Sequence, residues 1–188
     1  MTTARKQLLD LLVERSVLSG DFTLSSGQKS NVYVDVRLTA TSALGLALIG
    51  PAFLELFREQ GWWKPDAVIG LTLGADPLLA AVSYASALAG DPLDHLIVRK
   101  EAKGHGTKKW MEGRTEGIRR VIVIDDVWTT GGSTVKAVEA ARESGMTLVG
   151  AATLVDREQG AAAALAPIPT ARLFTLKELL AAKGVAAS

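Results

Sequence analysis

Two adjacent carboxylates and a loop of glycines and hydroxyls form the stretch of the chain best suited to chemistry. Asp125 and Asp126 follow the apolar run Val121–Ile124 and precede Thr-Thr-Gly-Gly-Ser-Thr at residues 129–134. Glycines let a backbone approach an anion closely, and the first N–H groups of a helix favour phosphate. Carboxylates would repel phosphate, but they accept hydrogen bonds from sugar hydroxyls, and Mg²⁺ can bind nearby. The stretch therefore favours a sugar phosphate as ligand.

The same stretch does not match the two common nucleotide-binding loops. The chain contains neither Gly-x-x-x-x-Gly-Lys-Ser/Thr nor Gly-x-Gly-x-x-Gly. An ordinary strand–turn–helix capped by Asp, Ser or Thr is the plainer alternative. Two adjacent acids followed by six glycines and hydroxyls exceed what a cap requires, so a ligand site is the preferred interpretation.

A basic segment is the second candidate for chemistry. Residues 99–120 hold eight Lys or Arg against three Glu, although the net charge of the whole chain is only +1. Each phosphate group of a ligand carries about −1.5 to −2 charges near neutral pH and would be attracted there. Gly104 and Gly106 flank His105, which favours a loop tip that closes over a ligand and excludes water. A solvated surface loop or a nucleic-acid patch is the alternative.

The composition restricts the class of protein. The chain has 188 residues, of which 48% are hydrophobic and 22% charged, which is typical of one folded domain. Its near-neutral charge argues against attraction of the whole protein to nucleic acid or membrane. The absence of cysteine excludes disulfides and thiolate zinc sites, and two histidines argue against a histidine-rich metal site. With no signal-peptide or membrane-spanning pattern, we expect a cytoplasmic protein.

The hydrophobic pattern predicts an α/β domain with a central parallel sheet flanked by helices. A β segment within residues 22–37 precedes it, a long polar loop spans 99–119, and Pro51 is expected to disturb the second helix. Ligand residues are expected at the carboxyl ends of the strands. The predicted helices are 3–18, 42–60, 77–88, 133–144 and 176–183, and the predicted strands are 67–71, 95–98, 121–124, 148–155 and 172–175.

Residues 121–134 closely resemble the PRPP-binding motif of the type I phosphoribosyltransferases, PRPP being 5-phosphoribosyl 1-pyrophosphate. In that family the two acids bind the ribose 2′- and 3′-hydroxyls, and the following loop cradles the 5-phosphate. Residues 69–77 lie where the family has its pyrophosphate loop. Within the PRPP-binding motif, Trp128 is larger than the residue usual in the family at that position. The resemblance implies a PRPP site made of Asp125, Asp126, Thr129, Thr130, Gly131, Gly132, Ser133, Thr134, Thr72 and Gly74.

The basic segment is similar to the catalytic loop of the orotate phosphoribosyltransferases. It contains Arg-Lys-Glu-x-Lys-x-His-Gly, with Glu-Gly a few residues later. The resemblance implies that Lys103 is the main catalytic residue. It also implies that the loop, residues 99–113, reaches into the site of a neighbouring subunit and that the protein is a homodimer. The implied catalytic set is Lys103, His105, Arg99, Lys100, Asp125 and Asp126.

Two further segments suggest how the base is bound. Residues 22–35 resemble the N-terminal hood of the same enzymes, which implies contacts to the base from Tyr33 and Val34. Residues 155–160 resemble the family's Asp-Arg-x-x-Gly turn, which implies that Arg157 binds orotate, with Thr129 beside it. An arginine fork suits the carboxylate and carbonyl oxygens of such a base.

The resemblance implies one phosphoribosyltransferase domain over residues 1–188, with a helix and hood to about residue 37 and an α/β core from about residue 38. Some members carry lysine where this chain has Ser25 and Gly74. The implied activity is transfer of the 5-phosphoribosyl group of PRPP to orotate, a pentosyltransferase step of pyrimidine biosynthesis. Mg²⁺ is expected as cofactor, held mainly through PRPP rather than by direct protein ligands. A purine phosphoribosyltransferase and a non-catalytic PRPP-sensing regulator remain alternatives.

Overall fold

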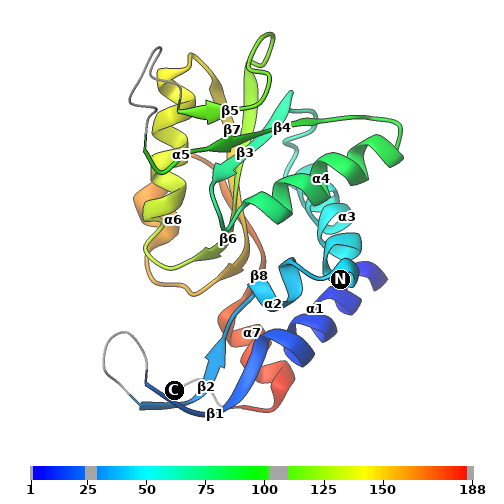
Figure 1. Cartoon of the computed structure of the whole chain (residues 1–188), viewed down its shortest axis with the longest axis vertical. Coiled ribbons are helices and arrows are strands. Elements are labelled where there is room, and N and C mark those ends of the chain that lie inside the picture. The colour runs from blue at the N-terminus through cyan, green and yellow to red at the C-terminus, as the bar shows by residue number, and fades with distance from the viewer. Residues whose placement is uncertain (1, 24–28, 102–109, 186–188) are drawn as a thin grey trace.

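A six-stranded sheet forms the centre of the computed structural model, which describes residues 2–23, 29–101 and 110–185 (Figure 1). Its strand order is β5-β4-β3-β6-β7-β8. All neighbouring strands run parallel except β5, which pairs antiparallel with β4. The strands are β3 Ala67–Leu71, β4 Asp94–Val98, β5 Met111–Glu112, β6 Arg120–Trp128, β7 Thr147–Asp156 and β8 Thr170–Thr175.

Helices cover both faces of this sheet, which explains the unbroken apolar runs of its central strands. Val68 and Ile122 pack in one buried cluster with α1, α3, α4 and α7. Their neighbours Ala67 and Val121 pack in a second cluster with α5 and α6, because successive side chains of a strand point to opposite faces. The helices are α1 Thr3–Ser16, α2 Arg37–Ala40, α3 Ala43–Glu59, α4 Asp76–Leu88, α5 Gly132–Glu143, α6 Ala161–Leu165 and α7 Leu176–Lys183.

The second predicted helix is confirmed as α3, which remains helical through Pro51. The disturbance expected at Pro51 is therefore wrong at the level of secondary structure. Pro51 and Ala47, whose carbonyl loses its usual partner, are both exposed, so water can bond to that carbonyl. Gly50 lies where α3 crosses α4, and a Cβ there would approach the Ala81 carbonyl oxygen to 2.3 Å.

The N-terminal β segment begins earlier than predicted. The first helix ends at Ser16 and not at residue 18, because Val17 is buried and pairs with Val34 across an antiparallel hairpin. The hairpin consists of β1 Val17–Thr23 and β2 Lys29–Val34. In Figure 1 it lies beyond the sheet at the end where the N- and C-terminal helices pack together.

Two other boundaries differ near the expected ligand site. The strand predicted to end at residue 124 continues as β6 to Trp128, because β7 supplies pairing partners as far as Asp156. The loop predicted over 99–119 contains β5, which pairs with the end of β4. The short helices α2 and α6 were not predicted. Across the described ranges, the structure contains no helix long and apolar enough to cross a membrane.

Candidate functional site

The strand order places the candidate site at a topological switch point. The chain passes from β3 to β4 on one side and later returns to β6 on the other side of β3. Segments leaving the carboxyl ends of β3 and β6 therefore diverge, and in open α/β sheets ligands bind in the resulting crevice. The residues predicted from sequence to bind PRPP follow these two strands.

Asp125 and Asp126 lie near the carboxyl end of β6, and their side chains have different hydrogen-bond partners. Asp125 is buried, and its Oδ2 accepts a hydrogen bond from Thr134 Oγ1 at 2.8 Å. Its Oδ1 accepts the backbone N–H of Asp126 at 3.0 Å. Asp126 is half-buried, and its Oδ1 accepts the N–H of Val127 at 2.8 Å. Both acids are thus held by short-range hydrogen bonds at the end of a buried strand.

Burial raises the pKa of Asp125 to about 7, although the hydrogen bond from Thr134 opposes this rise. Repulsion from the Asp126 carboxylate contributes to the same rise. A carboxyl that titrates near neutral pH beside a second acid is typical of a functional site. Sugar hydroxyls are suitable partners, because they bring hydrogen-bond donors without adding negative charge.

The loop after Trp128 leads into α5 without a capping side chain. Gly131, the residue before α5, has φ 83°, a left-handed conformation, and a Cβ there would lie 3.1 Å from Ala161 Cα. Because glycine offers no side-chain acceptor, the first N–H groups of α5 remain suited to an anion. Thr129 is half-buried, whereas Thr130, Gly132 and Ser133 are exposed. Thr134 differs from these, because it is buried with its hydroxyl engaged by Asp125.

The loop after β3 lies directly against Asp126. The N–H of Thr72 donates to Val98 O at 2.9 Å, and Thr72 Oγ1 donates to Asp76 Oδ2 at 2.8 Å. A Cβ at Gly74 would lie 2.7 Å from Asp126 Oδ1, so glycine is the residue that this contact permits. The predicted pyrophosphate loop and the acid pair are therefore brought together.

We expect Gly74→Ala to raise KM for PRPP about tenfold, because the added methyl displaces Asp126 or the loop at a cost of about 1.4 kcal/mol. Steady-state kinetics at varied PRPP measures this effect. Gly20→Ala is the control, since its Cβ would make only ordinary contacts with the Phe22 ring at 3.4 Å. An unchanged KM for Gly74→Ala would contradict the placement of PRPP against this loop.

The basic segment begins at Arg99, directly after the end of β4. Arg99 is half-buried, forms an ion pair with Glu112 on β5, and donates its N–H to Trp110 O at 2.8 Å. Lys100 is exposed. Arg99, Lys100 and Trp110 line a groove of about 250 Å³ beside α5. The predicted catalytic residues Lys103 and His105 lie outside the described residues.

The hood ends at an ion pair between Asp35 and Arg37. Tyr33 is exposed and packs on Phe22 with ring centroids 5.5 Å apart, and Val34 is half-buried. Arg37 Nε and Nη2 each donate to the Asp35 carboxylate at 2.8 Å. The pKa of Arg37 is raised mainly by Asp35, with smaller contributions from Tyr33 and Asp126. The charges of Arg37 and Asp126 therefore interact. The sequence analysis missed this interaction, and only the Asp-x-Arg spacing at the end of the hood could have suggested it.

Arg157 follows the end of β7. It is exposed, and its backbone N–H donates to Trp128 O at 2.8 Å, which places it next to the end of β6. The predicted base-binding residues thus lie on three segments: the hood, the turn after β7 and the loop after β6. Among residues 2–23, 29–101 and 110–185, no three or more His, Cys, Asp or Glu side chains are grouped to hold a metal ion.

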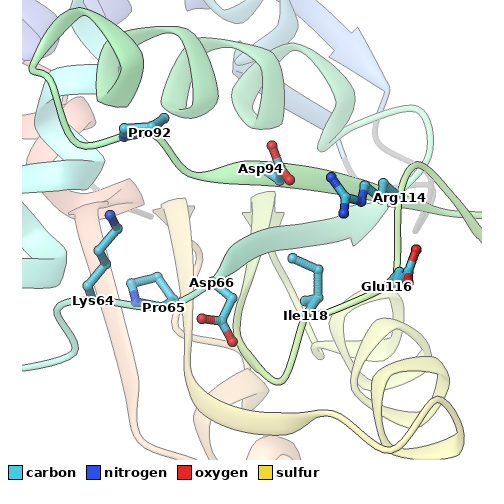
Figure 2. Close-up of a pocket in the computed structure, with 9 residues that line it drawn as sticks. Lys64, Pro65, Asp66, Pro92, Asp94, Arg114, Glu116 and Ile118 are labelled. Carbon is cyan, nitrogen blue, oxygen red and sulfur yellow. The ribbon is translucent and has the colours of Figure 1, made fainter.

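A cavity larger than the groove beside α5 lies at the opposite end of the strands. Its volume is about 480 Å³. Figure 2 shows residues that line it, among them Lys64, Asp66, Asp94 and Arg114. These residues precede β3 and β6 or begin β4, so the cavity lies at the amino ends of these strands. Asp66 is already engaged, because it accepts the N–H groups of Arg119 and Arg120 at 2.9 and 2.7 Å. The size of this cavity therefore does not make it the substrate site.

Comparison with known proteins agrees with this geometry. The model of the phosphoribosyl transferase domain matches residues 41–169, more than half of the chain. Orotate phosphoribosyltransferase of Thermosynechococcus vestitus is 47% identical, over 93% of this chain and 92% of that protein. The enzyme of the same name from Aquifex aeolicus is 43% identical, over 94% and 97%. The chain belongs to the orotate phosphoribosyltransferase family.

Solved orotate phosphoribosyltransferases share the fold. The Mycobacterium tuberculosis enzyme in complex with Fe(III) dicitrate matches with a TM-score of 0.83 and 39% identity, over 94% of this chain and 98% of that one. A complex of that enzyme with PRPP matches with a TM-score of 0.76 and 34% identity, over 95% and 93%. The predicted fold class, a central parallel sheet flanked by helices with a small N-terminal hood, is confirmed, and the described part of the hood belongs to the β1–β2 hairpin.

Proposed function

We infer that the protein transfers the 5-phosphoribosyl group of PRPP to orotate, giving orotidine 5′-monophosphate and pyrophosphate. The observation that carries this inference is the convergence of three elements at one switch point. These elements are the acid pair of β6, the uncapped start of α5 and the loop at Gly74. Together they provide acceptors for ribose hydroxyls and backbone N–H donors for phosphate.

The roles of the residues follow from what each can donate or accept. Asp125 and Asp126 accept hydrogen bonds from the ribose hydroxyls. The 129–134 loop binds the 5-phosphate through its N–H groups and through its hydroxyls other than that of Thr134, which donates to Asp125. A ring nitrogen of orotate attacks C1 of the ribose while the bond to pyrophosphate breaks, through a transition state with oxocarbenium character. Arg99, Lys100, Lys103 and His105 stabilise the charge that develops on the departing pyrophosphate. Orotate that binds already deprotonated at this nitrogen requires no strong general base.

Mg²⁺ fits the same arrangement, because half-buried Asp126 and the loop at Gly74 face the position proposed for the ribose and pyrophosphate oxygens. When bound through PRPP, the ion would supply further charge stabilisation for the leaving group. Asp125 and Asp126 would hold the ribose hydroxyls, and the protein itself would contribute few direct ligands to the ion.

The base is proposed to lie between the hood and the β7 turn. Tyr33 presents an exposed ring there, Val34 is the next residue of β2, and Thr129 is the first residue of the 129–134 loop. Arg157 is exposed beside Trp128, where its fork can pair with carboxylate or carbonyl oxygens of orotate. This arrangement accounts for a preference for a carboxylated pyrimidine.

We propose further that two copies of the chain form a homodimer in which the 99–113 loop serves the partner's site. In support, three large apolar side chains on or just before α4 are exposed: Leu73 at 75%, Tyr84 at 68% and Leu88 at 72%. Leu73 belongs to the loop that contacts Asp126 through Gly74. A second copy that covers this surface would therefore lie next to the site.

A spectrophotometric assay tests the function. Orotate loss in the presence of PRPP, with release of pyrophosphate, should require Mg²⁺, and adenine and xanthine should not replace orotate. Turnover of a purine in place of orotate would assign the protein to the purine enzymes. Tight PRPP binding without turnover of any base would indicate a PRPP-sensing regulator.

A further inference from the structure

Trp128 begins a short chain of hydrogen bonds that ends on Asp125. Its Nε1 donates to Thr134 Oγ1 at 2.8 Å, and Thr134 Oγ1 donates to Asp125 Oδ2 at 2.8 Å. Trp128 and Thr134 are each 1% exposed, and Asp125 is 6% exposed. The three side chains come from two elements, β6 and α5, so these bonds join the end of the strand to the first turn of the helix.

The chemistry of the donors fixes the direction of both bonds. An indole N–H can only donate, so Thr134 Oγ1 must accept from Trp128. The threonine hydroxyl has a single proton, and that proton is directed to the Asp125 carboxylate. Without Trp128 the hydroxyl could rotate and donate elsewhere, because hydroxyl hydrogens otherwise turn to suit their surroundings.

The result is a carboxylate with a defined set of remaining acceptor positions. A carboxylate accepts about four hydrogen bonds, and Thr134 and the Asp126 N–H occupy two of these positions on Asp125. The others stay available for sugar hydroxyls. We propose that Trp128 is a positioning residue, which acts through Thr134 to hold Asp125 ready for the ribose hydroxyls of PRPP. This proposal rests on the proposed function of the site.

A double-mutant cycle tests the proposal. Removing one neutral hydrogen bond corresponds to about a three- to tenfold change, so Trp128→Phe should raise KM for PRPP by that factor. KM for orotate should stay within about twofold. Thr134→Val should raise KM for PRPP at least as much, and the double variant should be no worse than Thr134→Val, because Trp128 acts through the missing hydroxyl.

Trp62→Phe is the matched control. Trp62 is also buried, but it packs on Gly150 and Phe57, toward the amino ends of the strands. It should alter the unfolding temperature without changing KM for PRPP. The proposal is overturned if Trp128→Phe behaves like Trp62→Phe, or if the effects of Trp128→Phe and Thr134→Val simply multiply. Turnover by the unaltered protein decides the proposed function separately.

A second measurement does not depend on the folding of Trp128→Phe. In protein labelled with ¹⁵N-tryptophan, PRPP should shift the indole N–H resonance of Trp128, because ribose binding to Asp125 changes the polarisation of the bond through Thr134. The Trp62 resonance should not move. PRPP binding that leaves the Trp128 resonance unchanged would refute the coupling, whether or not the protein turns over orotate.

Discussion

Asp125→Asn should lower kcat/KM for PRPP about 100-fold. One of the two acceptor positions that Asp125 offers to the ribose is lost and the other becomes neutral, and a hydrogen bond to a charged group contributes about 1.5–3 kcal/mol. Asparagine has one acceptor oxygen, whereas both oxygens of Asp125 already accept bonds from Thr134 and Asp126. Its amide nitrogen would therefore face a donor. Initial rates at varied PRPP, at saturating orotate and Mg²⁺, measure the loss.

The pH profile identifies the carboxyl group responsible. Because the pKa of Asp125 is raised to about 7, it is protonated below that pH and loses acceptor capacity. Log kcat/KM for PRPP should therefore fall by about one per pH unit below pH 7. Asp125→Asn should lack this fall and retain only the titration of PRPP itself, whose phosphates have a second pKa near 6.

Asp66→Asn is the control. Like Asp125, Asp66 accepts two hydrogen bonds, but it lies at the amino ends of the strands, away from the site. Its kcat/KM and pH profile should match those of the unaltered protein. An Asp125→Asn variant with the same acid limb as the unaltered protein would show that Asp125 is not the titrating group.

Subunits carrying Lys103→Ala and subunits carrying Asp125→Asn should each form nearly inactive homodimers, yet regain activity together. If Lys103 acts in the partner's site, a heterodimer has one intact site and one doubly impaired site. Random mixing yields about half heterodimers, so the mixture should reach about one quarter of full activity. Heterodimers isolated through two different affinity tags should reach about one half.

Asp125→Asn mixed with Asp126→Asn provides the matched control for this experiment. Both acids lie on β6 of the same subunit, so no mixture of these variants contains an intact site. If verified Lys103→Ala/Asp125→Asn heterodimers stay as inactive as this control, Lys103 acts within its own subunit and the shared-site proposal fails.

Much of the scaffold could be predicted from local patterns. Unbroken β-branched runs such as Val121–Ile124 identify strands covered on both faces, and the glycine after residue 144 marks the end of α5. The acid pair and its loop were recognisable because their residue types are unusual for a cap. The predicted ends of elements were wrong where pairing with another strand sets the boundary. Val17 pairs with Val34 instead of extending the first helix, and β6 extends to Trp128 because β7 pairs with it that far.

The fold class, the acid pair, the proposed phosphate loop and the basic segment could be predicted from sequence, since each is encoded by residue types close together in the chain. The folded chain was needed to see that Gly74 lies against Asp126, that the charges of Arg37 and Asp126 interact, and that Trp128 reaches Asp125 through Thr134. These contacts join segments from different strands, helices and the hood. They depend on strand order and on the packing of α5 against β6, which no local periodicity encodes.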